Sequence, residues 1–288
     1  MTQAVVDPTD IAAGLIAPLP PRSTRTRSPI VRALRRVLSW IISVGVVLLA
    51  WKLFLVVFHV NHFIGRTPLD VWHYVTSGPD AAEARSRLYH NSLTTLRDAF
   101  IGLAAGSIAA VALAILFNLA RSVEQTIMPL AMVLRSVPLV AMTPLIALIF
   151  GRGLATVTII SGIVTFFPTL VNVTLALRST PMASVDLGRA YGASRATMLR
   201  KVQIPSALPA LFASLRVAAP LALVGAVLAE FLVTGNGLGY LIETSMTSSV
   251  YNQLWAAVAL VTLYSTLLYT AIAGVEQRVL NRFADMPT

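Results

Sequence analysis

Six long apolar segments constrain the fold of this chain more than any other feature of its sequence. They cover residues 37–60, 93–119, 127–150, 154–177, 208–233 and 254–275. A helix needs about 20 mostly apolar residues to cross the hydrocarbon core of a bilayer, and each segment reaches that length. Only 12% of the 288 residues are charged, which is too few to cover the surface of a soluble protein. The sequence therefore predicts an all-α integral membrane protein with six transmembrane helices.

The basic residues predict how these helices are oriented, because Lys and Arg accumulate in cytoplasmic loops. Six arginines precede residue 37, and the loop after the fourth segment carries Arg189, Arg195, Arg200 and Lys201. The loop over residues 234–252, on the opposite side, has no basic residue. We therefore expect both termini, and the polar insert that follows the fourth segment, to face the cytoplasm.

The same pattern predicts the domain organisation. Residues 1–36 are rich in Pro, Thr, Ala and Arg and lack periodicity, which predicts a disordered basic cytoplasmic tail. The remaining divisions are a first transmembrane helix over 37–60, an extracytoplasmic loop over 61–91, a core over 92–278 with an insert at 181–205, and a cytoplasmic C-terminal tail over 279–288.

Motifs for catalysis or cofactor binding are absent from the sequence. There are no cysteines, no phosphate-binding loop and no nucleophile–base signature. His59 and His62 fit interfacial polar residues better than metal ligands. Asp98 and Glu230 lie near predicted helix ends, so no charged relay marks the bilayer midplane. We expect no catalytic, cofactor or metal site, and an external source of energy if the chain transports a solute.

The stretch DLGRAYGASRATMLRKVQIPSALP, residues 186–209, which contains most of the insert, interrupts the apolar pattern. Pro181 suits the beginning of a helix, and Gly192 can take the positive φ that ends one. Ser194 is a candidate N-cap for a second helix, which Pro205 is expected to stop. The sequence therefore predicts two short rigid helices that form a knob for a groove on a soluble partner.

The insert resembles the cytoplasmic EAA loop of ABC-transporter permeases, which reads E-A-A, three residues, G, nine residues, I-x-L-P. Residues 186–188, Asp-Leu-Gly, stand at the E-A-A positions, and Gly192 stands at the glycine. Val202, Ile204 and Pro205 stand at the closing positions. Asp in place of Glu, and Leu-Gly in place of Ala-Ala, are the departures from the family pattern.

The resemblance extends over residues 91–278. The stretches NSLTTLRDAFIGLAAGSIAAVALAILF and LRVAAPLALVGAVLAEFLVTGNGLGYLI are similar to the nitrate/sulfonate/taurine-type permeases. This resemblance implies the type I ABC importer (MetI-like) permease fold in a bacterial inner membrane. It also implies two permease subunits, here as a homodimer, two ABC ATPase subunits that bind ATP, and an extracytoplasmic substrate-binding protein. The implied cargo is a small polar solute such as a sulfonate, taurine, nitrate or a vitamin precursor.

The resemblance also assigns site residues. Coupling to the ATPase is expected at twelve residues of the insert, with Gly192 as the hinge: Asp186, Gly188, Arg189, Ala190, Tyr191, Gly192, Ala193, Ser194, Arg195, Val202, Ile204 and Pro205.

Polar and helix-breaking residues in the apolar segments are candidates for lining a solute pathway. We expect Pro138, Pro144, Asn172 and Glu230 to do so. Arg135 either attracts an anion in a cavity or extends its side chain toward the membrane boundary.

An alternative function is a stand-alone secondary carrier or channel. An importer of the ABC type would stop working without its partner ATPase. A carrier would continue to work and would respond to a proton or sodium gradient.

Overall fold

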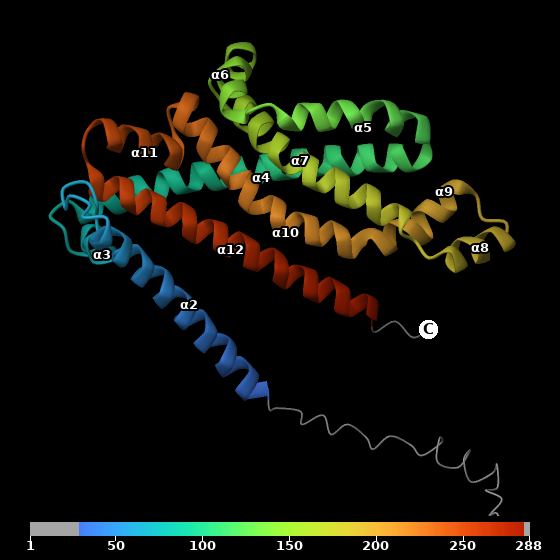
Figure 1. The fold of residues 1–288 in the computed structure, drawn as a ribbon, viewed down its shortest axis with the longest axis horizontal. Helices are drawn as coiled ribbons and strands as arrows, with labels where there is room; N and C mark the ends of the chain where they lie inside the picture. Colours follow the sequence, from blue (N-terminus) through green and yellow to red (C-terminus); the bar gives the residue numbers. More distant parts are fainter. Residues whose placement is uncertain (1–28, 285–288) are drawn as a thin grey trace, which may run out of the picture. The chain divides into compact units, whose positions relative to one another are not determined.

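The computed structural model describes residues 29–284, and every element assigned in that range is a helix (Figure 1). The chain divides into two compact units, Met1–Phe54 and Leu55–Thr288. Residues 1–28 of the predicted tail and residues 285–288 lie outside the described range. The elements are α2 Pro29–Val57, α3 Pro68–Thr76, α4 Ala81–Leu119, α5 Arg121–Ser136, α6 Leu139–Phe150, α7 Leu154–Arg178, α8 Met182–Ala190, α9 Arg195–Met198, the π-helical turn η1 Leu199–Gln203, α10 Ile204–Ala229, the π-helical turn η2 Glu230–Thr234, α11 Gly237–Thr247 and α12 Tyr251–Ala284.

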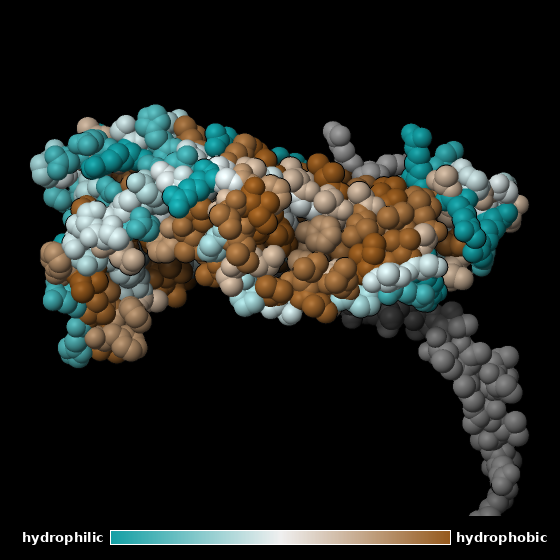
Figure 2. Space-filling view, turned by 90° about the horizontal axis from the view of Figure 1, so that it is seen from above, coloured by the Kyte–Doolittle hydropathy of each residue, from teal (hydrophilic) through white to brown (hydrophobic). Residues whose placement is uncertain are grey.

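Four helices of the described range are long and apolar enough to cross a membrane: α4, α7, the continuous helix Arg195–Thr234 and most of α12. The pair α5 and α6 passes the same test as one span that is bent by 102°. The first predicted segment corresponds to a shorter apolar stretch of α2, Ile41–Val57. The all-α membrane fold is confirmed, and these elements are consistent with six spans. Figure 2 shows hydrophobic residues across the middle of the drawn face and hydrophilic residues toward its ends.

The third apolar segment, residues 127–150, is expected to be broken by Pro129, Pro138 and Pro144, and the structure breaks it at Pro138. α5 ends at Ser136, and α6 begins at Leu139 after two residues with extended backbone, Val137 and Pro138. A proline disfavours the helical region for the residue before it and lacks the N–H that the helix would need, so the chain breaks here. Pro144, in contrast, lies inside α6 without ending it.

The predicted loop over residues 61–91 is largely helical, because it contains α3 and the first part of α4. Thr67 caps α3 through a capping box, in which its side chain accepts from Asp70 N and Asp70 bonds back to the Thr67 backbone. Burial raises the pKa of the Asp70 carboxyl, but the hydrogen bonds from Thr67 and the charges of His62 and Arg66 together lower it by a larger amount. The net pKa of Asp70 is therefore below its ordinary value.

Small residues let α7 pack closely against both α4 and α10. A Cβ at Gly106 of α4 would lie 2.9 Å from Gly162 Cα, and a Cβ at Gly225 of α10 would lie 2.8 Å from Ser161 Cα. The hydroxyl of Ser161 donates to the Ala222 carbonyl of α10 at 2.8 Å. The small-residue face predicted at Gly102 and Gly106 is thus a helix contact, as helix pairs in membranes commonly use.

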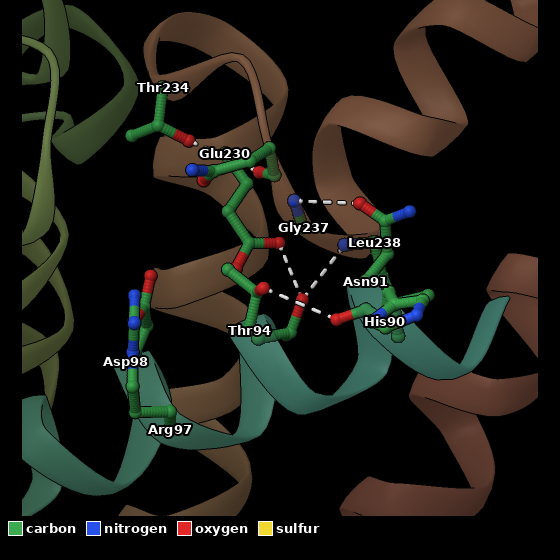
Figure 3. A network of polar contacts seen from close by, with 11 residues as sticks. His90, Asn91, Thr94, Arg97, Asp98, Glu230, Thr234, Gly237 and Leu238 are labelled. Carbon is green, nitrogen blue, oxygen red and sulfur yellow. Dashed lines mark hydrogen bonds and ion pairs between the residues drawn. The ribbon is translucent and has the colours of Figure 1, made fainter. Parts of the chain in front are cut away.

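A buried polar network holds the beginning of α11 against α4 and η2 (Figure 3). The Thr95 hydroxyl donates to Glu230 Oε2 at 2.7 Å and accepts from Leu238 N at 2.8 Å. Gly239 N donates to the same Glu230 oxygen at 2.9 Å, and Gly237 N donates to Asn91 Oδ1 at 3.0 Å. These amides belong to the first turn of α11, which lacks partners within the helix, so the Glu230 carboxylate caps it.

We expect Gly239→Ala to destabilise the protein, because the new Cβ would collide with the Val227 carbonyl and lie 2.7 Å from Glu230 Cβ. Overpacking of this kind costs about 1–3 kcal/mol. Thermal unfolding of the purified protein in detergent should show a melting temperature lower by several degrees. Gly274→Ala is the matched control, since no atom lies within 4 Å of its Cβ. Equal melting temperatures for the two variants would contradict the close packing of α11.

Candidate functional site

The insert begins with α8 and turns at Gly192. Gly192 has φ +70°, and its N–H donates to the Arg189 carbonyl at 2.9 Å. The next amide, Ala193 N, donates to the Gly188 carbonyl at 2.9 Å. This pair of bonds is the Schellman arrangement that ends many helices, and it favours glycine at the left-handed position. The predicted helix end at Gly192 is confirmed.

The second helix of the insert begins at once after this turn. The Ser194 side chain accepts a hydrogen bond from Thr197 N at 3.2 Å, which confirms Ser194 as the N-cap. A Cβ at Gly188 would collide with the terminal methyl of Met198, a residue that is 8% exposed. Gly188, at the third E-A-A position, therefore leaves room for α8 and α9 to pack against each other through Met198.

The prediction that Pro205 stops the second helix is wrong. Arg195–Thr234 is one continuous helix, in which α9, η1, α10 and η2 follow without interruption. In the wide turn η1, Ile204 N donates to the Leu199 carbonyl five residues earlier. Pro205 lies in the first turn of α10 directly after η1. The wider π turn thus accommodates the missing N–H of Pro205. The second helix of the insert and the fifth span are therefore parts of one continuous helix.

The base of the insert is anchored on α4, α5 and α7. Leu199 is buried in a core cluster with Phe117 and Leu177. Asn118 Nδ2 at the end of α4 donates to Gln203 Oε1 at 2.7 Å. An ion pair joins Arg178 at the end of α7 to Glu124 of α5. These contacts fix the position from which the insert projects.

The tip of the insert is exposed. Tyr191 is 84% exposed, and the ion pair of Asp186 with Arg189, at 3.6 Å, lies open to solvent. Such an exposed pair contributes little stability, so both charges can exchange partners. The predicted coupling residues that are exposed are Asp186, Arg189, Ala190, Tyr191, Gly192, Ser194 and Arg195. Those that are half-buried are Gly188, Ala193, Val202, Ile204 and Pro205.

Two cavities, of about 350 and 830 Å³, follow the seam between α7 and α10, and we call them together the α7–α10 groove. They share Val217. The first lies beside the α5–α6 break and is lined by Leu134, Arg135, Val137, Leu139, Met142, Ile163, Val164, Phe167, Pro168, Val217 and Leu221. The second reaches the base of the insert and is lined by Asn172, Leu175, Ala176, Ser179, Pro181, Ser206, Pro209, Ala210, Ala213, Arg216 and Val217.

Of the four predicted pathway residues, the structure places only Asn172 in the lining of the groove. Asn172 is exposed in the groove. Pro138 and Pro144 are exposed but do not line either cavity of the groove. Glu230 is 1% exposed and caps α11 instead, so its position is that of a structural carboxylate rather than of a groove residue.

A charged cluster on α10 and α12 was missed by the sequence analysis. Arg216 Nη1 lies 3.1 Å from Glu276 Oε2, and its guanidinium carbon lies 5.6 Å from the centre of the Tyr269 ring. Arg216 is the only basic residue in the apolar segment over 208–233, which is the signal that could have found it. Its partner Glu276 lies one residue beyond the last apolar segment. An acidic residue at such a position is ordinary, so nothing in the sequence indicated that it pairs with Arg216.

Comparisons with known proteins connect this architecture to a family. Residues 102–283 match the family model "Binding-protein-dependent transport system inner membrane component". A probable ABC transporter permease protein of Haemophilus influenzae is 29% identical over 82% of this chain and 94% of its own length. A riboflavin transport system permease protein of Chloroflexus aurantiacus is 36% identical over 57% of this chain and 60% of its own length.

A solved structure shows the same fold. A chain of the MetNI methionine ABC transporter superposes with a TM-score of 0.55 at 20% identity, over 71% of this chain and 99% of the other. The family match covers more than half of the sequence and includes the insert and the groove. The chain belongs to the family of binding-protein-dependent transport system inner membrane components, and it is the membrane-spanning permease subunit of an ABC importer.

Proposed function

We propose that this permease carries a small polar solute through the α7–α10 groove and that separate ATPase subunits drive it by docking on the tip of the insert. The observation that carries the proposal is the continuity of the tip with a membrane span: the helix that begins at Arg195 ends only at Thr234. A displacement of the tip is therefore a displacement of the groove wall.

Stiffness is the property that this coupling requires, since rigid-body motion transmits force between two states only through elements that do not bend. The Schellman turn at Gly192 joins α8 to α9, and Met198 packs α9 onto Gly188. Leu199 and Gln203 fix the base of the insert to α4 and α7. The exposed tip, centred on Tyr191, is left for the partner.

The proposed partners follow from the family. ATP is bound and hydrolysed by two ABC ATPase subunits, so this chain needs no cofactor. A second copy of the permease completes the pathway as a homodimer, and an extracytoplasmic substrate-binding protein delivers the solute. The relative from Chloroflexus aurantiacus is named for riboflavin transport. For this chain we propose a small polar solute of the sulfonate, taurine, nitrate or vitamin-precursor kind.

The proposed orientation places the insert and both termini in the bacterial cytoplasm. The basic residues Arg189, Arg195, Arg200 and Lys201 all lie on the insert or its continuation. Their concentration on one side of the membrane is what the positive-inside rule requires of a cytoplasmic loop.

We expect Tyr191→Ala to weaken association with the ATPase by about tenfold or more, because a buried aromatic anchor contributes about 2 kcal/mol to an interface. Gly192→Pro should abolish uptake, since proline cannot adopt the φ of +70° found there. Co-purification of the ATPase and ATP-dependent uptake into proteoliposomes are the measurements.

Tyr89→Ala is the control, because Tyr89 is also well exposed, at 61%, but lies on α4 away from the insert. Unchanged ATPase association by Tyr191→Ala together with unchanged uptake by Gly192→Pro would remove the insert from the mechanism. Uptake that persists without the ATPase would indicate a stand-alone carrier.

The orientation can be tested by labelling, because the chain has no native cysteine. A membrane-impermeant maleimide should label Ser194→Cys in inside-out vesicles and leave it unlabelled in intact cells. Leu69→Cys, on α3 and 73% exposed, should give the reverse pattern. Labelling of Ser194→Cys in intact cells would show that the insert faces outward.

The groove predicts where water reaches the interior of the membrane. A charged thiol reagent should modify Asn172→Cys, since Asn172 lines the larger cavity. Leu267→Cys is the control, because Leu267 is 51% exposed on α12 outside the groove and should face lipid, where thiols react poorly. Equal modification rates in membrane vesicles would show that the groove is not the aqueous route.

A further inference from the structure

Resting on the proposed function, we propose that the smaller cavity of the groove binds the anionic group of the transported solute through Arg135. Residues of the α5–α6 break and of α7 and α10 line this cavity of about 350 Å³. Figure 1 shows the break between α5 and α6. The lining of the cavity is apolar except for Arg135. A cavity at the lower end of the size range of ligand pockets, with one polar group to orient the ligand, fits a small solute with one oxyanion group.

Three arginines lie within the predicted apolar segments, Arg97, Arg135 and Arg216, and among the described residues Arg135 alone of these three has no acidic partner. Among the described residues, Arg97 pairs with Asp98, Arg178 pairs with Glu124, and Arg216 pairs with Glu276. No carboxylate of the described chain lies within ion-pair distance of Arg135. An arginine at membrane depth is costly unless it faces a wet cavity or an opposite charge. The missing charge is therefore supplied from outside the chain.

The helices that surround the cavity place it near the middle of the bilayer. Ile163 and Pro168 lie in the middle third of α7, and Val217 lies in the middle third of α10. α7, and the continuous helix that contains α10, are both long and apolar enough to cross a membrane. Arg135 itself lies near the end of α5 that is remote from the α4–α5 turn. At about 1.5 Å per residue, roughly 20 Å separates it from Arg121, which is too far for its side chain to reach that boundary.

The larger cavity beside this one offers a route by which an anion bound at Arg135 can leave. The two cavities of the groove share Val217, so a solute held at Arg135 has the larger cavity directly beside it. In that larger cavity Arg216 is already neutralised by Glu276. An anion would thus be attracted at the middle of the membrane and meet no second unpaired arginine on the groove wall. Binding strong enough to select and weak enough to release is what transport requires.

The absence of native cysteine allows a direct test of the potential in the groove. The permease assembled with its ATPase subunits, in phosphatidylcholine vesicles, would carry Val217→Cys. Its reaction rates with the anionic reagent 2-sulfonatoethyl methanethiosulfonate and with a cationic trimethylammonium analogue would be compared. The rate ratio should favour the anion and fall about fivefold when Arg135→Gln is added, as the loss of one nearby charge predicts. Methanesulfonate should slow labelling, and Arg135→Gln should remove that protection.

Two further variants separate charge from structure. Arg135→Lys should keep most of the anion preference, and Arg152→Gln, which removes an exposed arginine outside the groove, should leave it unchanged. A ratio insensitive to Arg135→Gln would overturn the proposal and would indicate neutralisation by a carboxylate of a second copy. Loss of the preference on adding phosphatidylglycerol would assign the site to a lipid headgroup instead. Failure of both reagents to react would refute the groove as an aqueous route, which is a failure of the proposed function itself.

Discussion

The close approach of α7 to α4 and α10 is the contact on which the rest of the structure depends. Without a hydrophobic driving force between helices in lipid, association relies on packing and on a few hydrogen bonds. Gly106 and Gly162 bring two backbones together on one side of α7. Ser161 and Gly225 do so on the other side, with the Ser161 hydroxyl bonded across to α10. Side chains larger than these would separate the helices and remove the shape of both the groove and the insert.

The packing of α7 against α4 and α10 also fixes the elements that lie at the two ends of α7 and α10. At one end, Leu177 of α7 and Leu199 of η1 share a core cluster, so the insert leaves the membrane from a fixed base. At the other end, the chain reverses at η2 and Glu230 ties α11 down through Thr95. Between them the seam opens into cavities around Val217. The same packing thus supports the exposed tip of the insert, the cavities of the groove and the attachment of α11.

The sequence predicted the parts of this structure that depend on local chemistry. Apolar length identified the spans, and Gly192 and Ser194 identified the turn and cap of the insert. It failed where tertiary context overrides a local rule. Pro205 reads as a helix stop, yet a π turn carries the helix through it. Glu230 reads as a pathway acid, because nothing local shows that amides eight and nine residues later fold back onto it and its neighbour Thr95.

The unbroken helix from Arg195 to Thr234 has a thermodynamic consequence. Its 40 residues extend over roughly 60 Å, which exceeds the thickness of the hydrocarbon core about twofold. One end carries the exposed tip that we propose as the docking surface for the ATPase, and the other end carries the Glu230 carboxylate that caps α11. Linkage between two binding sites is reciprocal: if two ligands bind at opposite ends of this helix and both favour the same tilt, each raises the affinity of the other by the same factor. Under the proposed function, binding of the solute-loaded delivery protein at one end of this helix would therefore change the affinity for the ATPase at the other end.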